Sequence, residues 1–154
     1  MMRRFVPRCG EMIDQRTFSA RLERLREYLD QLRSIRASAR EAFVADPILR
    51  AAGERYLHLA LESALDIGNH IIAERGYPRP ETYAAVLTVL ADKGILPDSI
   101  YRDLDGMAAF RHLLVHDYAR LDHGRIYDVL VQKYPVLEAL FECYVRQLDD
   151  QPGE

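Results

Sequence analysis

The chain has 154 residues, of which 49% are hydrophobic, and its 21 basic and 24 acidic residues give a formal net charge of −3. A chain of this size can bury about 70% of its unfolded surface in one domain, which excludes a disordered chain and a small scaffold that depends on disulfides. The negative charge excludes a general attraction to nucleic acid, so any RNA binding has to come from a local basic patch.

Cysteine usage and hydropathy indicate the compartment. Cys9 and Cys143 lie far apart and lack the spacing of a zinc site or a disulfide framework, which favours a reducing cytoplasm. No apolar run has the length of a signal peptide or a membrane span, so we expect a cytoplasmic protein with no membrane partner. We expect residues 1–13 to be a disordered segment or an extension, residues 14–148 to form one helical domain, and residues 149–154 to be a polar tail.

The composition, rich in Leu, Ala, Arg and Glu, predicts an all-α fold, an up-down bundle of four to five helices. The first helix is predicted to begin after an N-cap at Asp14 or Thr17 and to run to about Phe43, with apolar residues at helical spacing. Its polar face carries mixed charges and is interpreted as a solvated face, with a basic rim that guides RNA as the alternative.

The second helix is predicted to begin at Asp46-Pro47 and to end at Gly76, and it is apolar around nearly its whole circumference. A polar stripe nevertheless steps along it every four residues: His58, Glu62, Asp66 and His70, with Asn69 beside them. One interpretation is a buried polar seam whose carboxylates accept hydrogen bonds from Arg or His of neighbouring helices. The others are a supporting shell for a catalytic centre and, less favoured, a metal site.

Three further helices complete the prediction. The third spans Glu81–Lys93 with Tyr83 pointing inward, and Gly94 ends it. The fourth opens at residues 97–99 and continues to the motif described below, with Gly106 as a point where two helices approach closely. The last is predicted to run from a cap at Asp122 to about Leu148, with a kink or break at Pro135.

Residues 109–118, AFRHLLVHDY, contain the spacing Arg-x4-His-x-Tyr near the end of the fourth helix. On an ideal helix Arg111 and Tyr118 point within about 20° of each other, whereas His116 lies about 140° from Arg111. Arg111 and His116 can therefore meet at one ligand only if the helix ends between them or if a second chain contributes. The structural alternatives are an ion pair of Arg111 with Glu62 or Asp66, a helix-end cap at His116, and an ordinary hydrogen bond from Tyr118.

Several stretches resemble one known family. They are residues 59–76 (LALESALDIGNHIIAERG), 79–83 (RPETY), 91–97 (ADKGILP) and 107–118 (MAAFRHLLVHDY). Together with Arg-x4-His-x-Tyr, in this order, they resemble the HepT toxins, a branch of the HEPN superfamily of helical ribonucleases. The position after Arg111 is often Asn in that family and is His112 here, which leaves the role of His112 open.

The resemblance implies a HEPN-like homodimer that cuts RNA without a metal or cofactor, with Arg111 and His116 of both copies in one composite cleft. Glu62, Asp66, Asn69 and His112 are the expected supporting residues. It further implies that a nucleotidyltransferase antitoxin, MntA-like, silences the toxin by adding AMP to Tyr118. The RNA target stays open between messenger RNA and the 3′ end of transfer RNA.

Two alternative functions remain at this stage. The first is a non-catalytic helical module that binds a nucleotidyltransferase or a nucleotide. The second is a metal-dependent hydrolase using His58, His70, His112 or His116. His112 and His116 lie four residues apart, as zinc ligands can, but no third ligand has dependable spacing, so no metal site is predicted.

Overall fold

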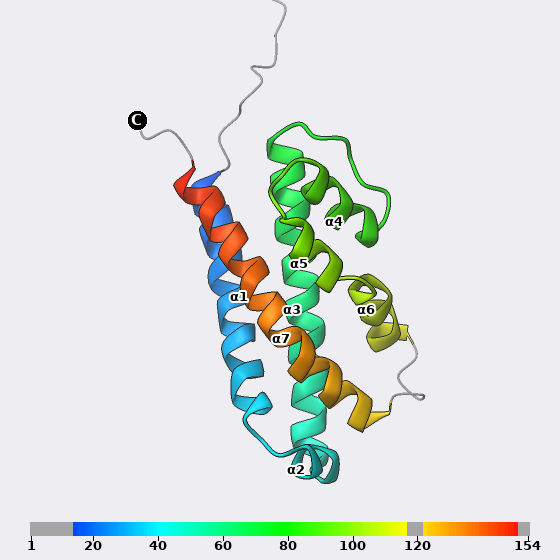
Figure 1. The fold of residues 1–154 in the computed structure, drawn as a ribbon. Helices are drawn as coiled ribbons and strands as arrows, with labels where there is room; N and C mark the ends of the chain where they lie inside the picture. The colour runs from blue at the N-terminus through cyan, green and yellow to red at the C-terminus, as the bar shows by residue number, and fades with distance from the viewer. Residues whose placement is uncertain (1–13, 117–121, 151–154) are drawn as a thin grey trace, which may run out of the picture.

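The computed structural model describes residues 14–116 and 122–150. Within these residues all regular secondary structure is helical and there is no strand, which confirms the predicted all-α fold (Figure 1). The helices are α1 (Gln15–Arg36), α2 (Arg40–Ala45), α3 (Pro47–Glu74), α4 (Tyr83–Asp92), α5 (Asp98–Asp103), α6 (Met107–His116) and α7 (His123–Asp149). The predicted extension at residues 1–13, with Cys9, and residues 151–154 of the predicted tail lie outside the described residues.

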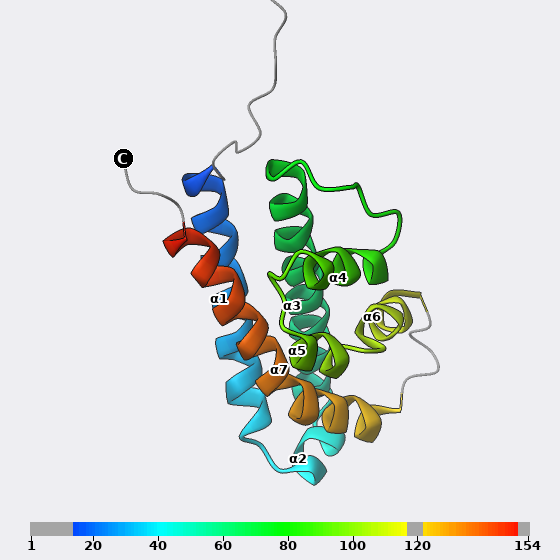
Figure 2. The same ribbon diagram turned by 45° about the horizontal axis from the view of Figure 1, so that its top comes forward.

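Three long helices, α1, α3 and α7, form the main body of the bundle, and both ribbon views show them running side by side (Figures 1 and 2). Helices α4, α5 and α6 follow one another along one side of α3, and α2 closes one end. The core between the helices is made of fully buried side chains, among them Phe18, Leu29, Leu57, Ile67 and Tyr144. The Tyr144 hydroxyl donates a hydrogen bond to the Ala64 carbonyl at 2.9 Å, which ties α7 to α3 inside this core.

The start of α1 agrees with the prediction, because the Asp14 carboxylate accepts a hydrogen bond from the backbone N–H of Arg16. The predicted end at Phe43 was wrong, since α1 ends at Arg36 and a separate short helix α2 follows. The reason is the packing of Phe43, which is fully buried and whose ring lies 5.3 Å from that of Tyr127 in α7. The turn between α1 and α2 is what brings Phe43 to that position.

Helix α3 begins as predicted, with Asp46 accepting hydrogen bonds from the backbone N–H groups of Ile48 and Leu49. The third predicted helix starts two residues late, at Tyr83, because the Thr82 hydroxyl caps it. The fourth is two helices, α5 and α6, separated at Gly106, whose φ of 79° is left-handed. Among the described residues, no atom other than those of its chain neighbours lies within 4 Å of the position a Cβ would take at Gly106, so the expected close approach of two helices was wrong.

Helix α7 begins at the predicted cap, where Asp122 accepts from the N–H groups of Gly124 and Arg125. It continues through Pro135 to Asp149, so the predicted break is absent. Pro135 is exposed, and the missing N–H therefore falls on the solvent side of the helix, while Tyr134 and Leu137 stay buried on the other side. In the described part of the chain no helix combines the length and apolar character that crossing a bilayer requires.

Candidate functional site

Arg111 of α6 is held by side chains from two other helices. Its Nη2 atom lies 3.5 Å from Oε1 of Glu62 in α3, and its guanidinium carbon lies 4.2 Å from the ring centre of Tyr83 in α4. The Arg111 side chain is only 13% exposed, and its Nε atom is buried without a hydrogen-bond partner. Because Nε is buried, a phosphate can contact this guanidinium only through its Nη atoms.

The Glu62 carboxylate lies close to two basic side chains, those of His58 and Arg111. Its Oε2 atom lies 3.2 Å from Nε2 of His58, one turn earlier in α3, while Oε1 faces Arg111. The His58 contact has ion-pair distance but not hydrogen-bond geometry, and the other ring nitrogen of His58 lies 3.2 Å from Nη1 of Arg55. Burial lowers the pKa of His58, which favours the neutral ring. The charge of Glu62 is therefore directed chiefly at Arg111.

The other predicted supporting residues of α3 are placed differently. The carboxylate of Asp66 forms no ion pair within residues 14–116 and 122–150, and its backbone carbonyl accepts a hydrogen bond from Arg21 Nη1 at 3.3 Å. Burial, with Glu62 nearby as a second cause, raises the pKa of the Asp66 carboxyl. Asn69 lines a different cavity, of about 580 Å³, together with Tyr77 and Arg79.

Among the side chains that the structure describes, the histidines of the polar stripe and His112 of α6 do not form a metal centre. His70 stacks on Phe18 at a ring distance of 5.8 Å, and burial lowers its pKa. His112 is exposed on α6. In the part of the chain that the structure describes, no three His, Cys, Asp or Glu side chains lie close enough together to hold a metal ion.

The second half of the motif is described only in part. The backbone of α6 remains helical through His116, but the His116 side chain lies outside the described residues. Tyr118 lies outside them entirely. The structure therefore describes the position of Arg111 and the helical backbone that connects it to His116.

Two features of this region were missed by sequence reasoning. Tyr83 was predicted to point into the core, yet its side chain is 38% exposed and lies against Arg111. Its position in the RPETY stretch, which was already singled out, was the available signal. Sequence reasoning also assigned no role to His123, whose Nδ1 lies 2.9 Å from Oε1 of the buried Glu54 and links the start of α7 to α3.

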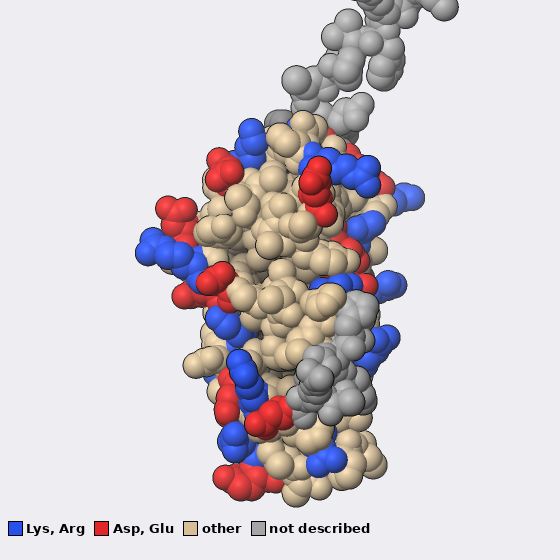
Figure 3. All heavy atoms as spheres, turned by 90° about the vertical axis from the view of Figure 1, so that its right-hand side faces the viewer, with Lys and Arg blue, Asp and Glu red and all other residues tan. Residues whose placement is uncertain are grey.

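The surface beside the site is mostly uncharged. Figure 3 turns the side of the molecule that carries α4 and α6 toward the viewer, and its charged side chains lie mainly around the margins. Arg111 itself adds little to this surface because it is nearly buried. Most basic side chains on this side of the molecule therefore lie at the edges of this face.

Comparison with known proteins identifies the family. The model of the family described as "Ribonuclease HepT-like" matches residues 25–143. The chain is 23% identical over 134 residues to the tRNA nuclease HepT of Aphanizomenon flos-aquae, covering 85% of this chain and 91% of that protein.

Solved structures show the same fold. The cytosolic protein YutE of Bacillus subtilis superimposes with a TM-score of 0.78 at 21% identity, covering 94% of this chain and 99% of that one. A tri-AMPylated HEPN toxin of Shewanella oneidensis, solved in complex with an MNT antitoxin, gives a TM-score of 0.75 at 19% identity, with coverages of 84% and 96%. The chain therefore belongs to the ribonuclease HepT-like family, as the Arg-x4-His-x-Tyr motif and its flanking stretches indicated.

Proposed function

We propose that the protein is a metal-independent endoribonuclease toxin of a toxin-antitoxin system, which acts in the cytoplasm as a homodimer. Arg111 and His116 of two copies form the composite catalytic site. The observation that best supports this proposal is the placement of Arg111. Its guanidinium is held by Glu62 and Tyr83, and only its Nη atoms are available to a ligand.

The chemistry needs a base, an acid and a fixed positive charge. An imidazole takes the proton of the ribose 2′-OH, the 2′ oxygen bonds to the adjacent phosphorus, and the bond to the 5′ oxygen breaks as that oxygen takes a proton from an imidazolium. Arg111 stabilises the charge that gathers on the phosphate oxygens. His116 is suited to the proton transfers because the unperturbed pKa of histidine lies close to neutrality.

The geometry of α6 favours a site made by two copies. Arg111 and His116 can meet within one chain only if the helix ends between them, and α6 remains helical through His116. On such a helix the two side chains diverge by about 140°. A second copy supplies the missing partner for each residue, so that both pairs serve one cleft.

Tyr118 is the proposed site of silencing. The Shewanella oneidensis relative is AMPylated and bound to an MNT antitoxin, and Tyr118 occupies the Tyr position of Arg-x4-His-x-Tyr in this chain. An MntA-like nucleotidyltransferase would add AMP there, seven residues from Arg111. The added negative charge and bulk exclude the RNA phosphate from the site.

Cleavage by the purified protein tests the catalytic assignment. In the presence of EDTA, wild-type protein should cut transfer RNA or messenger RNA, and Arg111→Ala and His116→Ala should each abolish cleavage while circular dichroism shows a folded domain. Arg102→Ala, at an exposed position of α5, is the control and should cleave normally. Cleavage that persists in both motif variants refutes the assignment, and intact RNA with wild-type protein favours a non-catalytic module.

The silencing step has its own test. Co-expression with a cognate nucleotidyltransferase should raise the intact mass of the protein by the mass of one or more AMP groups. Tyr118→Phe should abolish this increase, because it removes the hydroxyl that accepts AMP. An unchanged increase in Tyr118→Phe places the modification elsewhere.

A further inference from the structure

A cavity of about 490 Å³ lies between α1 and α3, directly beside the Arg111 centre. Its α1 side is formed by Arg21, Arg24 and Tyr28, and its α3 side includes Glu62, Ser63 and Asp66. Glu62 belongs to both places, since it lines this cavity and contacts Arg111. An RNA strand bound at Arg111 can therefore pass Glu62 and extend into this cavity.

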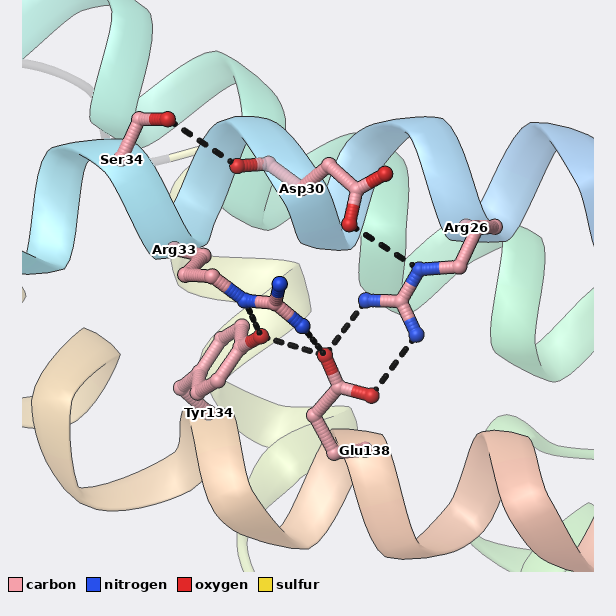
Figure 4. Close-up of polar contacts among 6 residues, drawn as sticks. All are labelled: Arg26, Asp30, Arg33, Ser34, Tyr134 and Glu138. Atoms are coloured by element: carbon pink, nitrogen blue, oxygen red, sulfur yellow. Dashed lines mark hydrogen bonds and ion pairs between the residues drawn. The ribbon is translucent and has the colours of Figure 1, made fainter.

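The two arginines of this cavity differ from Arg26 and Arg33 of the same helix. On the side of α1 that faces α7, Arg26 and Arg33 converge on Glu138, and Arg26 forms a two-pronged ion pair with it (Figure 4). Within the described residues, neither Arg21 nor Arg24 forms an ion pair with a carboxylate. Arg21 donates to the Asp66 backbone carbonyl, which is uncharged, so this contact does not neutralise the Arg21 charge.

The remaining lining is suited to a nucleobase. The half-buried Tyr28 ring lies 6.3 Å from the Tyr56 ring and presents an aromatic wall to the cavity. Base stacking on such rings is a common source of affinity for single-stranded RNA. The carboxylates of Glu62 and Asp66 can accept hydrogen bonds from the exocyclic amino group of a base. Cations, an aromatic ring and acceptors together match one nucleotide with its phosphate.

We propose that this cavity binds a nucleotide of single-stranded RNA next to the linkage that is cut. Arg21 and Arg24 hold its phosphates, Tyr28 stacks on its base, and the carboxylates of Glu62 and Asp66 favour bases that carry an amino group over uracil. The inference rests on the proposed ribonuclease function. It assigns binding of the RNA strand to residues of α1 and α3 that lie outside the Arg-x4-His-x-Tyr motif.

Binding of a non-cleavable RNA analogue tests the cavity separately from catalysis. The probe is a fluorescein-labelled 2′-O-methyl oligonucleotide of about a dozen nucleotides, which lacks the attacking hydroxyl. The double variant Arg21→Gln/Arg24→Gln should bind it about tenfold more weakly, and the slope of log affinity against log salt should become shallower by about 1.4, the loss expected for two single-strand phosphate contacts. Tyr28→Leu should weaken binding about tenfold without changing that slope.

The control is Arg33→Gln/Arg36→Gln, which makes the same change in charge on the side of α1 where Arg33 and Arg36 contact Tyr134. It should bind the probe like wild type. Equal binding by the double variant and this control overturns the cavity assignment. If Arg111→Ala still abolishes cleavage in that case, the proposed ribonuclease function stands alone.

Two further measurements decide between occupants. If AMP alone competes with the probe at equal concentration, the cavity is a free-nucleotide site and the RNA assignment fails. If sedimentation shows that Arg21→Gln/Arg24→Gln changes the oligomeric state while the control does not, the cavity is part of an interface between copies, which also overturns the proposal. A wild-type protein that neither cuts RNA nor binds the probe refutes the proposed function and the cavity assignment together.

Discussion

Arg111 lies over the Tyr83 ring, with its guanidinium carbon 4.2 Å from the ring centre, and this contact joins α6 to α4. Glu62 of α3 lies 3.5 Å from the same guanidinium. The position of one cation thus depends on three helices. If Arg111 has to meet a phosphate in a fixed geometry, each of these contacts should affect cleavage without being part of the reaction.

Tyr83→Leu should lower the rate of RNA cleavage about three- to tenfold, because it removes the aromatic face that attracts the guanidinium. Tyr83→Phe keeps that face and should retain the wild-type rate. Tyr83 is 38% exposed, so neither change should alter thermal unfolding much. Single-turnover cleavage of the two variants checks this, and equal rates for Leu and Phe would show that the ring does not position Arg111.

His123→Ala should lower the free energy of unfolding by about 1–3 kcal/mol, since it leaves the buried Glu54 carboxylate without its 2.9 Å partner. Arg125→Ala is the control, because Arg125 is exposed two residues later and forms no side-chain ion pair within the described residues. Urea unfolding followed by circular dichroism measures both. A loss no larger than that of Arg125→Ala would contradict the role of His123.

Glu138 should make the stability of the protein depend on acid pH. The hydrogen-bonded Arg26 lowers the pKa of Glu138 to about 2, and Tyr134 also donates to it (Figure 4). Because the folded pKa lies below the ordinary value of 4.5, the stabilisation is present above pH 4.5 and is lost as the pH falls toward about 2.

Glu138→Gln should therefore destabilise the protein by about 1–3 kcal/mol near neutral pH, and this difference should shrink by more than half near pH 3. Glu142→Gln, at an exposed position one turn later in α7, is the matched control and should show no such pH dependence. Urea unfolding at several pH values measures the difference. A constant gap between wild type and Glu138→Gln would mean that Arg26 does not stabilise the ionised form.

Gly68→Ala should destabilise the bundle although alanine favours helices. A Cβ at Gly68 would lie 2.9 Å from Val86 Cγ1 and 3.1 Å from the Tyr144 hydroxyl, so α4 and α7 would have to move. We expect a loss of about 1–3 kcal/mol. In a Val86→Ala background, which removes the nearest atom, the cost of Gly68→Ala should be smaller, and equal costs in both backgrounds would contradict this packing.

The helices that sequence predicted best are those with local signals at their ends. Asp46 and Asp122 are caps whose carboxylates accept the first N–H groups of α3 and α7, and both begin where expected. Two predicted helices proved to be divided, one into α1 and α2 and the other into α5 and α6. These divisions depend on distant contacts or on backbone conformation. Phe43 leaves the line of α1 to pack against α7, and a glycine that separates two helices, as Gly106 does, has the same sequence signature as one that permits close packing.

The candidate site, like the fold, was predicted in part from the sequence. The motif located Arg111, and the four-residue stripe on α3 put Glu62 among its candidate partners, which the structure confirms at 3.5 Å. Helical periodicity could not separate Glu62 from Asp66, because both lie on the same face of α3. It also placed Tyr83 inside the core, since an aromatic residue at the edge of an apolar face has the same spacing whether it packs inward or covers a cation.

The division between the three long helices and the row of α4, α5 and α6 has a consequence for how activity is lost on heating. Arg111 and Tyr83 both lie in the row, whereas α1, α3 and α7 pack on one another, with α5 as the part of the row that also contacts α7. A partial opening that detaches α4 from α6 would separate the cation from its aromatic cover while most of the helical signal survives. Inactivation should then precede melting of the bundle, and enzyme assays would report damage that far-ultraviolet spectra miss.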